Sequence, residues 1–230
     1  YLDHIGLTPG RDYWYTVNPR CDNWYKNDIA KQFYFNVIAL LLQDFIDEDR
    51  LARMVADLTE APRMTGSNRT LVSISVFYRG VIEKNPARIA AGIAGVMDQV
   101  EISLEEGIQP DYSFHQHGPF IYNGSYGSNF LRETIWLAPI VQGTRFAYSA
   151  EQMAVLRDYY LQGTRWMLRC GLFDYNVRGR QVGRSSSFLL GTGDIIPQLD
   201  RFIVSDPAHA DLYRDSQARI LAQKPQAITG

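Results

Sequence analysis

The sequence has little cysteine, little net charge and no long apolar run, and each shortage excludes a class of protein. Two cysteines among 230 residues, Cys21 and Cys170, are too few for a disulfide framework, and one bridge or two free thiols both remain open. The formal net charge of −2 does not favour a nucleic acid or a membrane as partner. The longest purely apolar run, "VIALLL" at 37–42, is far too short to cross a bilayer.

Metal ligands are also scarce. The chain has 4 histidines and no HExxH motif. His115 and His117 lie two residues apart, a spacing that suits a metal pair, but a catalytic zinc needs a third protein ligand. The other histidines, His4 and His209, lie in unrelated surroundings. We therefore expect no metal site and no cofactor, and we expect His115 to be a loop histidine.

Aromatic residues, in contrast, are abundant, with 14 Tyr, 11 Phe and 4 Trp. Several lie in polar segments, such as Trp24 and Tyr25 in "DNWYKND". An aromatic ring in a polar loop can stack on the flat face of a sugar. The alternative is that these two residues only cap the helix that follows them.

Apolar residues recur at helical spacing along most of the chain. The first of these stretches is expected to bury a broad face that includes Val37, Leu41 and Phe45. Residues 171–200 are rich in Gly, Ser and Arg and are predicted to be irregular. The predicted helices cover about 27–47, 49–58, 68–84, 85–107, 127–141, 150–168 and 208–222.

Successive helices with short links, and no convincing strands, predict an all-α array of antiparallel hairpins. Sites usually lie in the longer loops between buried helices. Three loops stand out in the sequence: "MTGSNRT" at 64–70, the segment 110–127 with "HQHGPFIYNGSYG", and "FDYNVRGRQVGRSSS" at 173–187.

These loops allow two kinds of sugar chemistry. A glycoside hydrolase needs two carboxylates in a cleft, and Asp111 and Asp174 lie in suitable loops. β-Elimination next to a uronate instead needs a group that neutralises the sugar carboxylate, a base for the C5 proton and an acid for the leaving oxygen. The loops supply an amide, a histidine, a tyrosine and two arginines for these tasks: Asn68, His117, Tyr126, Arg180 and Arg184.

In this order, "TGSN" (65–68), "YSFHQHGPFIYNGSYG" (112–127) and "DYNVRGRQVGR" (174–184) resemble the active-site motifs of polysaccharide lyase family 8. That family contains chondroitin AC, hyaluronate and xanthan lyases, and the resemblance is strongest to the chondroitin AC branch. It implies an incomplete α/α toroid with a long cleft. It also implies that residues 1–230 are a single partial catalytic domain of a longer chain, without the family's β-sandwich domains.

The resemblance implies a role for each matching residue. Asn68 matches the residue that hydrogen-bonds the uronate carboxylate, and His117 matches the histidine beside C5. Tyr126 matches the tyrosine that acts first as base and then as acid. From the residues alone, either His117 or Tyr126 can be the base, because free histidine has a pKa near 6.5 and free tyrosine one of about 10. A helix cap at Asn68 and a core position at Tyr126 are the structural alternatives.

Four further residues match substrate contacts of the family. Arg180 matches the arginine next to the catalytic tyrosine, and Arg184 one that grips the polysaccharide. Trp24 and Tyr25 match the aromatic patch that orients sugars, although Tyr25 stands where the family usually has a second Trp. The alternative for the two arginines is a solvated pair.

Together these features predict a lyase that cleaves a uronic-acid-containing polysaccharide by β-elimination and leaves 4,5-unsaturated uronate ends. A glycosaminoglycan such as chondroitin or hyaluronan is the expected substrate, and the expected location is secreted or periplasmic in a bacterium. The β-sandwich domains are expected to complete the site. An α/α-barrel glycoside hydrolase and a non-catalytic carbohydrate-binding domain remain the alternatives.

Overall fold

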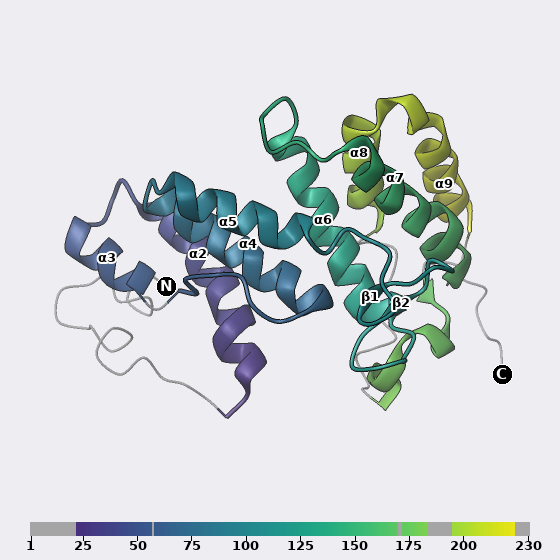
Figure 1. Ribbon diagram of the computed structural model, residues 1–230, viewed down its shortest axis with the longest axis horizontal. Helices are drawn as coiled ribbons and strands as arrows, with labels where there is room; N and C mark the ends of the chain where they lie inside the picture. Colours follow the sequence, from purple (N-terminus) through teal and green to yellow (C-terminus); the bar gives the residue numbers. More distant parts are fainter. Residues whose placement is uncertain (1–21, 57, 170–171, 184–194, 224–230) are drawn as a thin grey trace. The chain divides into compact units, whose positions relative to one another are not determined.

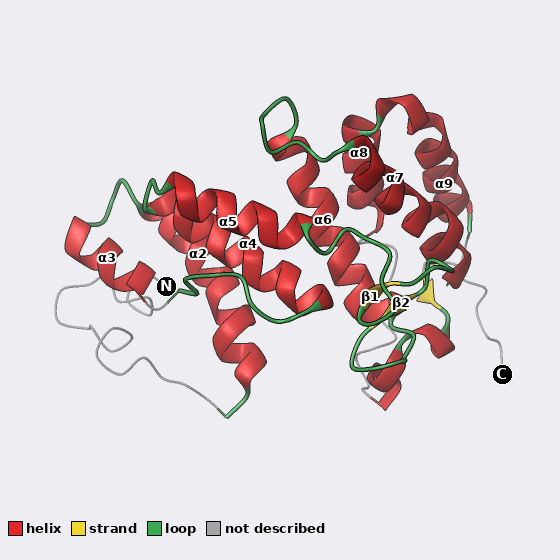
Figure 2. Cartoon of the chain, viewed as in Figure 1, coloured by secondary structure: helices red, strands yellow, loops and turns green. Residues whose placement is uncertain are grey.

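A computed structural model describes residues 22–56, 58–169, 172–183 and 195–223 of the chain (Figure 1). Helices dominate these residues, and strands occur only as two-residue pairs (Figure 2). The predicted all-α class is therefore confirmed. Within the described segments, no helix is both long and apolar enough to cross a membrane.

The long helices follow one another along the chain. They are α2 (Lys31–Leu42), α3 (Glu48–Ala56), α4 (Gly66–Ile82), α5 (Pro86–Met97), α6 (Ser128–Val141), α7 (Ala150–Asp158), α8 (Ile195–Ser205) and α9 (Ala210–Ala222). Longer connections occur before α6 and before α8. The π-helical turns are η2 (Lys26–Ala30), η3 (Asn123–Gly127) and η4 (Tyr159–Gly163). The 3-10 turns are η5 (Thr164–Met167), η6 (Tyr175–Val177), η7 (Gly179–Gly183) and η10 (Pro207–His209).

Two short antiparallel hairpins, which the sequence did not predict, interrupt the helices. β1 (Gly107–Ile108) pairs with β2 (Phe114–His115), and β3 (Leu168–Arg169) pairs with β4 (Leu172–Phe173). Two-residue strands are too short for a recognisable alternation of apolar and polar residues. Each hairpin nevertheless fixes a loop that carries site residues.

Two predictions about the helices are wrong. The helix expected over 85–107 ends at Met97, and Gly107 begins β1 with φ of +124°. The helix α8 (Ile195–Ser205) was not predicted at all, because residues up to 200 were expected to be irregular and the next predicted helix began at 208. Pro197 lies in the first turn of α8, where proline is tolerated because that N–H has no intrahelical partner.

The chain forms two compact units. The first comprises the described residues up to Arg63 together with Val72–Ala94. In this unit α4 and α5 pack closely, because a Cβ on Gly92 would lie 2.5 Å from the backbone nitrogen of Phe77. Its core contains Ala39, Met54, Val55, Leu58 and Ile82.

The broad apolar face predicted for the first helix is only partly right, because Ile29 is buried and Phe33 and Leu40 are partly buried, whereas Val37 is 44% exposed. Leu41 and Phe45 are 72% and 83% exposed, whereas α2 buries Gln32, Asn36 and Ala39. Gln32 is buried because its Oε1 accepts a hydrogen bond of 2.9 Å from the backbone N–H of Thr59. This hydrogen bond joins α2 to Thr59, which follows α3, and it favours the burial of the α2 face that carries Gln32.

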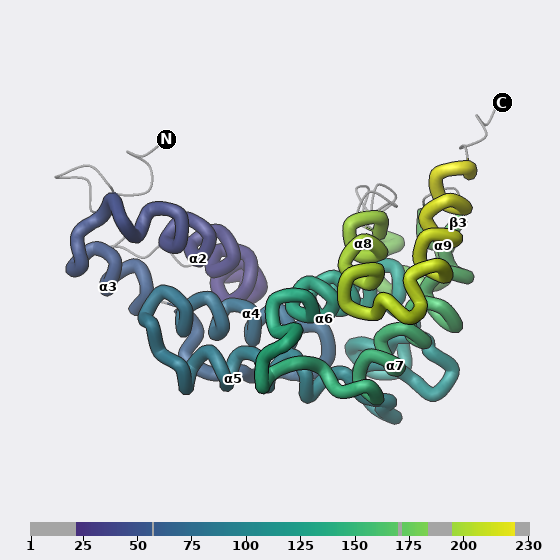
Figure 3. Tube along the Cα trace, turned by 90° about the horizontal axis from the view of Figure 1, so that it is seen from above, coloured from purple at the N-terminus to yellow at the C-terminus, as the bar shows by residue number. Residues whose placement is uncertain are grey.

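The second unit comprises Met64–Leu71 and the described residues from Gly95 onward. α6 is central to its core, where Phe130, Leu131 and Ile135 have no exposed surface. α8 and α9 lie side by side (Figures 1 and 3), and the rings of Phe202 and Tyr213 stack between them at 4.8 Å. The core around α6 matters for the site because η3, which carries Tyr126, continues directly into α6.

Candidate active site

The loop that carries His117 and Tyr126 is held by buried backbone hydrogen bonds. The N–H of Phe114 in β2 donates to Oδ1 of Asn123 over 2.8 Å, and the N–H of Tyr122 donates to the Phe114 carbonyl over 2.7 Å. Both contacts attach the β1–β2 hairpin to the π-helical turn η3, which continues directly into α6. Such π-helical turns occur frequently at functional sites. Here the turn places Tyr126 at the beginning of α6.

His117, Tyr126 and Arg180 meet in one cluster. Nε2 of His117 lies 3.0 Å from Oη of Tyr126, and the two rings are nearly perpendicular at 87°. Nη2 of Arg180 lies 3.2 Å from His117 Nε2 and 3.4 Å from Tyr126 Oη. Hydrogen-bond distances of this length permit proton transfer. The structure thus brings together three of the residues predicted from the sequence.

Arg180 also fixes the tautomer of His117. A guanidinium group can only donate hydrogen bonds, so Nε2 of His117 accepts and the proton of the neutral ring resides on Nδ1. Burial of the His117 ring lowers its pKa below the ordinary value, and the positive charge of Arg180 lowers it further, whereas the Glu106 carboxylate raises it. The ring is therefore neutral at neutral pH, with a lone pair facing Tyr126.

The position of Arg180 depends on a glycine and on a second tyrosine. The backbone N–H of Arg180 donates to Oη of Tyr122 over 2.8 Å. Gly179 has φ of +50°, and a Cβ there would come within 2.3 Å of the Tyr122 ring. Only glycine fits both the conformation and the space. Tyr122 was not predicted as a site residue, although it lies in the quoted "IYNGSYG" run.

Glu106 holds the His117 segment in place. Its Oε1 accepts a hydrogen bond of 2.7 Å from the backbone N–H of His117, and its Oε2 accepts one of 2.6 Å from Thr65 Oγ1. The side-chain amide of Gln116 donates to the same Oε2. His117 has φ of +61°, which is uncommon for a residue other than glycine, so these contacts stabilise an unusual backbone conformation. The sequence offered no signal for Glu106 beyond its charge.

Asn68 lies in the first turn of α4, which is attached to the same loop. The N–H of Ser67 donates to Oε1 of Gln116 over 3.0 Å. Asn68 is only 6% exposed, and its Oδ1 is buried without a hydrogen-bond partner among the described residues. α4 begins at Gly66, so Asn68 is not its N-cap. A buried amide oxygen without a partner is unfavourable, which fits an atom that a ligand or another part of the protein would contact.

The remaining predicted residues lie in the first unit or outside the described residues. Trp24 and Tyr25 belong to the first unit, where both are partly exposed and their rings lie edge to face at 6.1 Å. Their role in sugar binding stays a prediction. Arg184, Cys21 and Cys170 lie outside the described residues.

Asp111 and Asp174, the carboxylates considered for a glycoside hydrolase, each make a hydrogen bond within their own loop. Asp111 accepts hydrogen bonds from the N–H and the hydroxyl of Ser113, which lower the pKa of Asp111. Asp174 accepts from the N–H of Asn176 over 2.8 Å. Both contacts span two residues and are typical of Asx turns, so they give no support to a catalytic carboxylate pair. His115 is half-buried in β2.

No group of three or more His, Cys, Asp or Glu side chains suited to a metal ion occurs in the part of the chain that the structure describes. The fold and the site together define an all-α protein with a His–Tyr–Arg cluster suited to proton transfer. The family model described as "Polysaccharide lyase family 8, N terminal alpha-helical domain" matches residues 6–194. The chain belongs to this family.

Individual relatives agree with this assignment. Chondroitinase-AC of Pedobacter heparinus is 31% identical over 178 residues, which cover 75% of this chain and 25% of that protein. Xanthan lyase of Bacillus sp. (strain GL1) is 29% identical over 210 residues, which cover 87% of this chain and 22% of that protein. The chain thus spans about a quarter of the length of these relatives.

A solved structure shows the same fold. Chondroitinase AC lyase, described with enzyme–oligosaccharide complexes, is 28% identical with a TM-score of 0.85, over 92% of this chain and 32% of that chain. The match confirms the predicted fold class, that of the helical part of the chondroitin AC lyase branch.

Proposed function

We propose that this chain carries the proton-transfer site of a lyase that cleaves an acidic polysaccharide by β-elimination. The three-way contact between His117, Tyr126 and Arg180 carries this proposal. It supplies a proton acceptor, a hydroxyl that can exchange a proton, and a cation beside that hydroxyl. The names of the relatives, which are chondroitinase, xanthan lyase and hyaluronate lyase, support the same reaction class.

The reaction follows from these contacts. Nε2 of His117 takes the proton of Tyr126, and Arg180 stabilises the resulting phenolate by donating a hydrogen bond to its oxygen. The phenolate removes the C5 proton of the uronate, the C4–O bond breaks, and its electron pair leaves with the oxygen while the C4=C5 double bond forms. Tyr126 then gives its new proton to the leaving oxygen, and His117 returns the first proton to Tyr126, which restores both side chains. Protons and electrons balance without a cofactor.

Asn68 is the candidate for the uronate carboxylate. Removal of a proton next to a carboxylate places further negative charge on that group, which needs hydrogen-bond donors. The Asn68 amide lies at the start of α4, which Gln116 attaches to the His117 segment. That its buried Oδ1 lacks a partner fits the prediction that β-sandwich domains complete the site. That completion stays a prediction.

The proposed substrate is a glycosaminoglycan such as chondroitin or hyaluronan, because the chondroitinase-AC relative is 31% identical to this chain. Such polymers are too large to enter a cell intact, so we propose a secreted or periplasmic bacterial enzyme. Because the chain spans about a quarter of these relatives, the test requires the full-length protein.

The test is ultraviolet absorbance during digestion of chondroitin, hyaluronan, xanthan and alginate. β-Elimination is expected to produce absorbing unsaturated uronate in proportion to new chain ends. New reducing ends without this absorbance would instead support the glycoside hydrolase. Binding of polysaccharide without any cleavage would support the carbohydrate-binding domain.

A further inference from the structure

A second cationic cluster lies in the second unit, away from the residues assigned to catalysis. The guanidinium carbon of Arg165 in η5 lies 4.6 Å from the centre of the Trp166 ring. That of Arg219 in α9 lies 5.6 Å from the same ring. Trp166 is 61% exposed. Two arginines more than fifty residues apart thus share one exposed indole ring.

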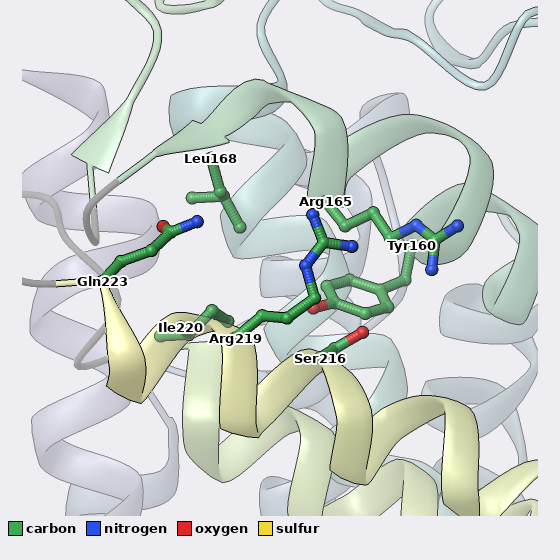
Figure 4. A pocket seen from close by; sticks show the side chains of 7 residues that line it. All are labelled: Tyr160, Arg165, Leu168, Ser216, Arg219, Ile220 and Gln223. Carbon is green, nitrogen blue, oxygen red and sulfur yellow. The ribbon is translucent and has the colours of Figure 1, made fainter.

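A small cavity adjoins this cluster. Its volume of about 20 Å³ has room for roughly one water-sized atom group. Figure 4 shows Arg219 reaching from α9 across the Tyr160 ring toward the segment that carries Arg165, whose own guanidinium group points to the other side. The cavity is lined by Tyr160, Arg165, Leu168, Ser216, Arg219, Ile220 and Gln223. Cationic groups and the Tyr160 hydroxyl therefore surround a space that fits one oxygen atom of a larger group, whereas Ser216 Oγ already donates to the Leu212 carbonyl over 3.0 Å.

The two guanidinium groups have no acidic partner among the described residues. The other arginines of these helices do: Arg157 of α7 lies 3.7 Å from a carboxylate oxygen of Asp206, and Arg214 of α9 lies 2.8 Å from one of Asp211. Nε of Arg165 is buried and, within the described part of the chain, has no hydrogen-bond partner. Stacking on Trp166 occupies the face of a guanidinium group and leaves its N–H edge available.

We propose that the Arg165–Trp166–Arg219 cluster binds a carboxylate or sulfate group of an acidic polysaccharide. Arginine N–H groups match the oxygen spacing of both anions, and an exposed indole can contact the adjoining sugar ring. The cavity accepts one anion oxygen beside the Tyr160 hydroxyl, which has no hydrogen-bond partner among the described residues. This inference rests on the proposed function for its ligand, because it takes the ligand to be the same polymer.

The chain connects this cluster to the catalytic one. η5 continues into β3, which pairs with β4, and the N–H of Asp174 donates to the Met167 carbonyl over 2.8 Å. The 3-10 turns that follow include Arg180 in η7. A polymer long enough to reach from the Arg165–Trp166–Arg219 cluster to Arg180 would contact both sites. Such a contact raises the affinity for long chains through effective concentration.

The test compares Arg219→Gln and the double variant Arg165→Gln/Arg219→Gln with Arg214→Gln. Arg219 is exposed on α9, so Arg219→Gln alone is expected to fold normally. Arg214→Gln removes the same charge from the same helix and serves as the matched control. Dissociation constants for size-selected chondroitin sulfate are measured with Tyr126→Phe as background, so that no substrate is consumed.

We expect the double variant to raise the Kd for the long polymer at least about fivefold, as expected for lost charge-assisted hydrogen bonds. The loss should be smaller for a tetrasaccharide, and Arg214→Gln should bind like the parent. Unsulfated chondroitin and carboxyl-reduced chondroitin sulfate identify which anion is bound, because only the polymer that keeps that anion responds to the variants.

Equal Kd values for the parent, the double variant and Arg214→Gln on all polymers would overturn the proposed site, as would an equal loss for all chain lengths. The lyase proposal and the binding-site proposal can fail independently of each other. If the protein cleaves nothing but the double variant still binds more weakly, the site stands and the lyase proposal fails. If it produces unsaturated uronate and all variants bind equally, the lyase stands and this site fails.

Discussion

At the scale of single residues, the proposed reaction depends on making a tyrosine hydroxyl reactive. Free tyrosine has a pKa of about 10, so few of its molecules are ionised at neutral pH. Tyr126 contacts both a neutral imidazole that can accept its proton and a guanidinium group that can stabilise the phenolate. We therefore expect the three side chains to act as one unit, so that the losses of rate caused by removing each of them are not additive.

Tyr126→Phe is the most direct test of this unit. It removes one hydroxyl and almost no volume, so kcat should fall at least about 100-fold, the low end for loss of general acid–base catalysis. Tyr148→Phe is the matched control, because it removes a hydroxyl that only donates to the Thr134 carbonyl over 3.1 Å. Initial rates by ultraviolet absorbance and thermal unfolding of both variants provide the comparison. Near-parental turnover of Tyr126→Phe would exclude the proton shuttle.

The pH dependence of the rate should report His117. Burial and the charge of Arg180 hold the pKa of His117 below its ordinary value, so the ring stays neutral until the pH falls below about 6.5. A protonated His117 cannot accept the proton of Tyr126. The acid limb of kcat/KM is therefore expected below pH of about 6.5, with activity lost as the pH decreases through it. An acid limb well above that value would contradict the assignment.

At the scale of elements, the site is assembled by short irregular segments attached to long helices. η3 joins α6, η7 carries Arg180, and the segment after β2 carries His117. Glu106 connects two of these parts, because it accepts from the His117 N–H and from Thr65, just before α4. Glu106 thus acts through His117 and is a positioning residue.

Glu106→Gln should reveal that role in two ways. The new amide NH₂ cannot accept the hydrogen bonds that reach Oε2, so the His117 segment should shift and kcat/KM should fall about tenfold. The lost carboxylate also raised the pKa of His117, so the acid limb should move to lower pH. Glu105→Gln is the control, because it removes the same charge one residue away at an exposed position. A lower rate without a shifted acid limb would indicate a structural role alone.

The sequence predicted the three residues that meet in the cluster but not the residues that support them. His117, Tyr126 and Arg180 were predicted because a reaction demands those side chains and a family motif places them. Glu106 and Tyr122 support that cluster through contacts between segments more than ten residues apart, which no local pattern records. Most of the long helices, α8 excepted, were predicted from periodicity, whereas the hairpins and the face of α2 depend on tertiary hydrogen bonds.

At the scale of the whole molecule, the fold is retained although most residues differ from those of its relatives. Identity to the solved chondroitinase AC lyase is 28%, yet the TM-score is 0.85. Such agreement requires only that buried positions remain apolar and of suitable volume. The core around α6 is therefore expected to control stability independently of the chemistry at its N-terminal end.

Ile135→Ala separates stability from chemistry. Ile135 has no exposed surface and lies in the core of the second unit, more than two turns of α6 beyond Tyr126. Its truncation leaves a cavity and should lower the free energy of unfolding by about 2–5 kcal/mol. Because the variant keeps the His117, Tyr126 and Arg180 contacts, kcat well below the unfolding temperature should stay within about twofold of the parent. Denaturant unfolding and initial rates measure both quantities, and a large loss of kcat in a fully folded sample would show that the core and the site are coupled.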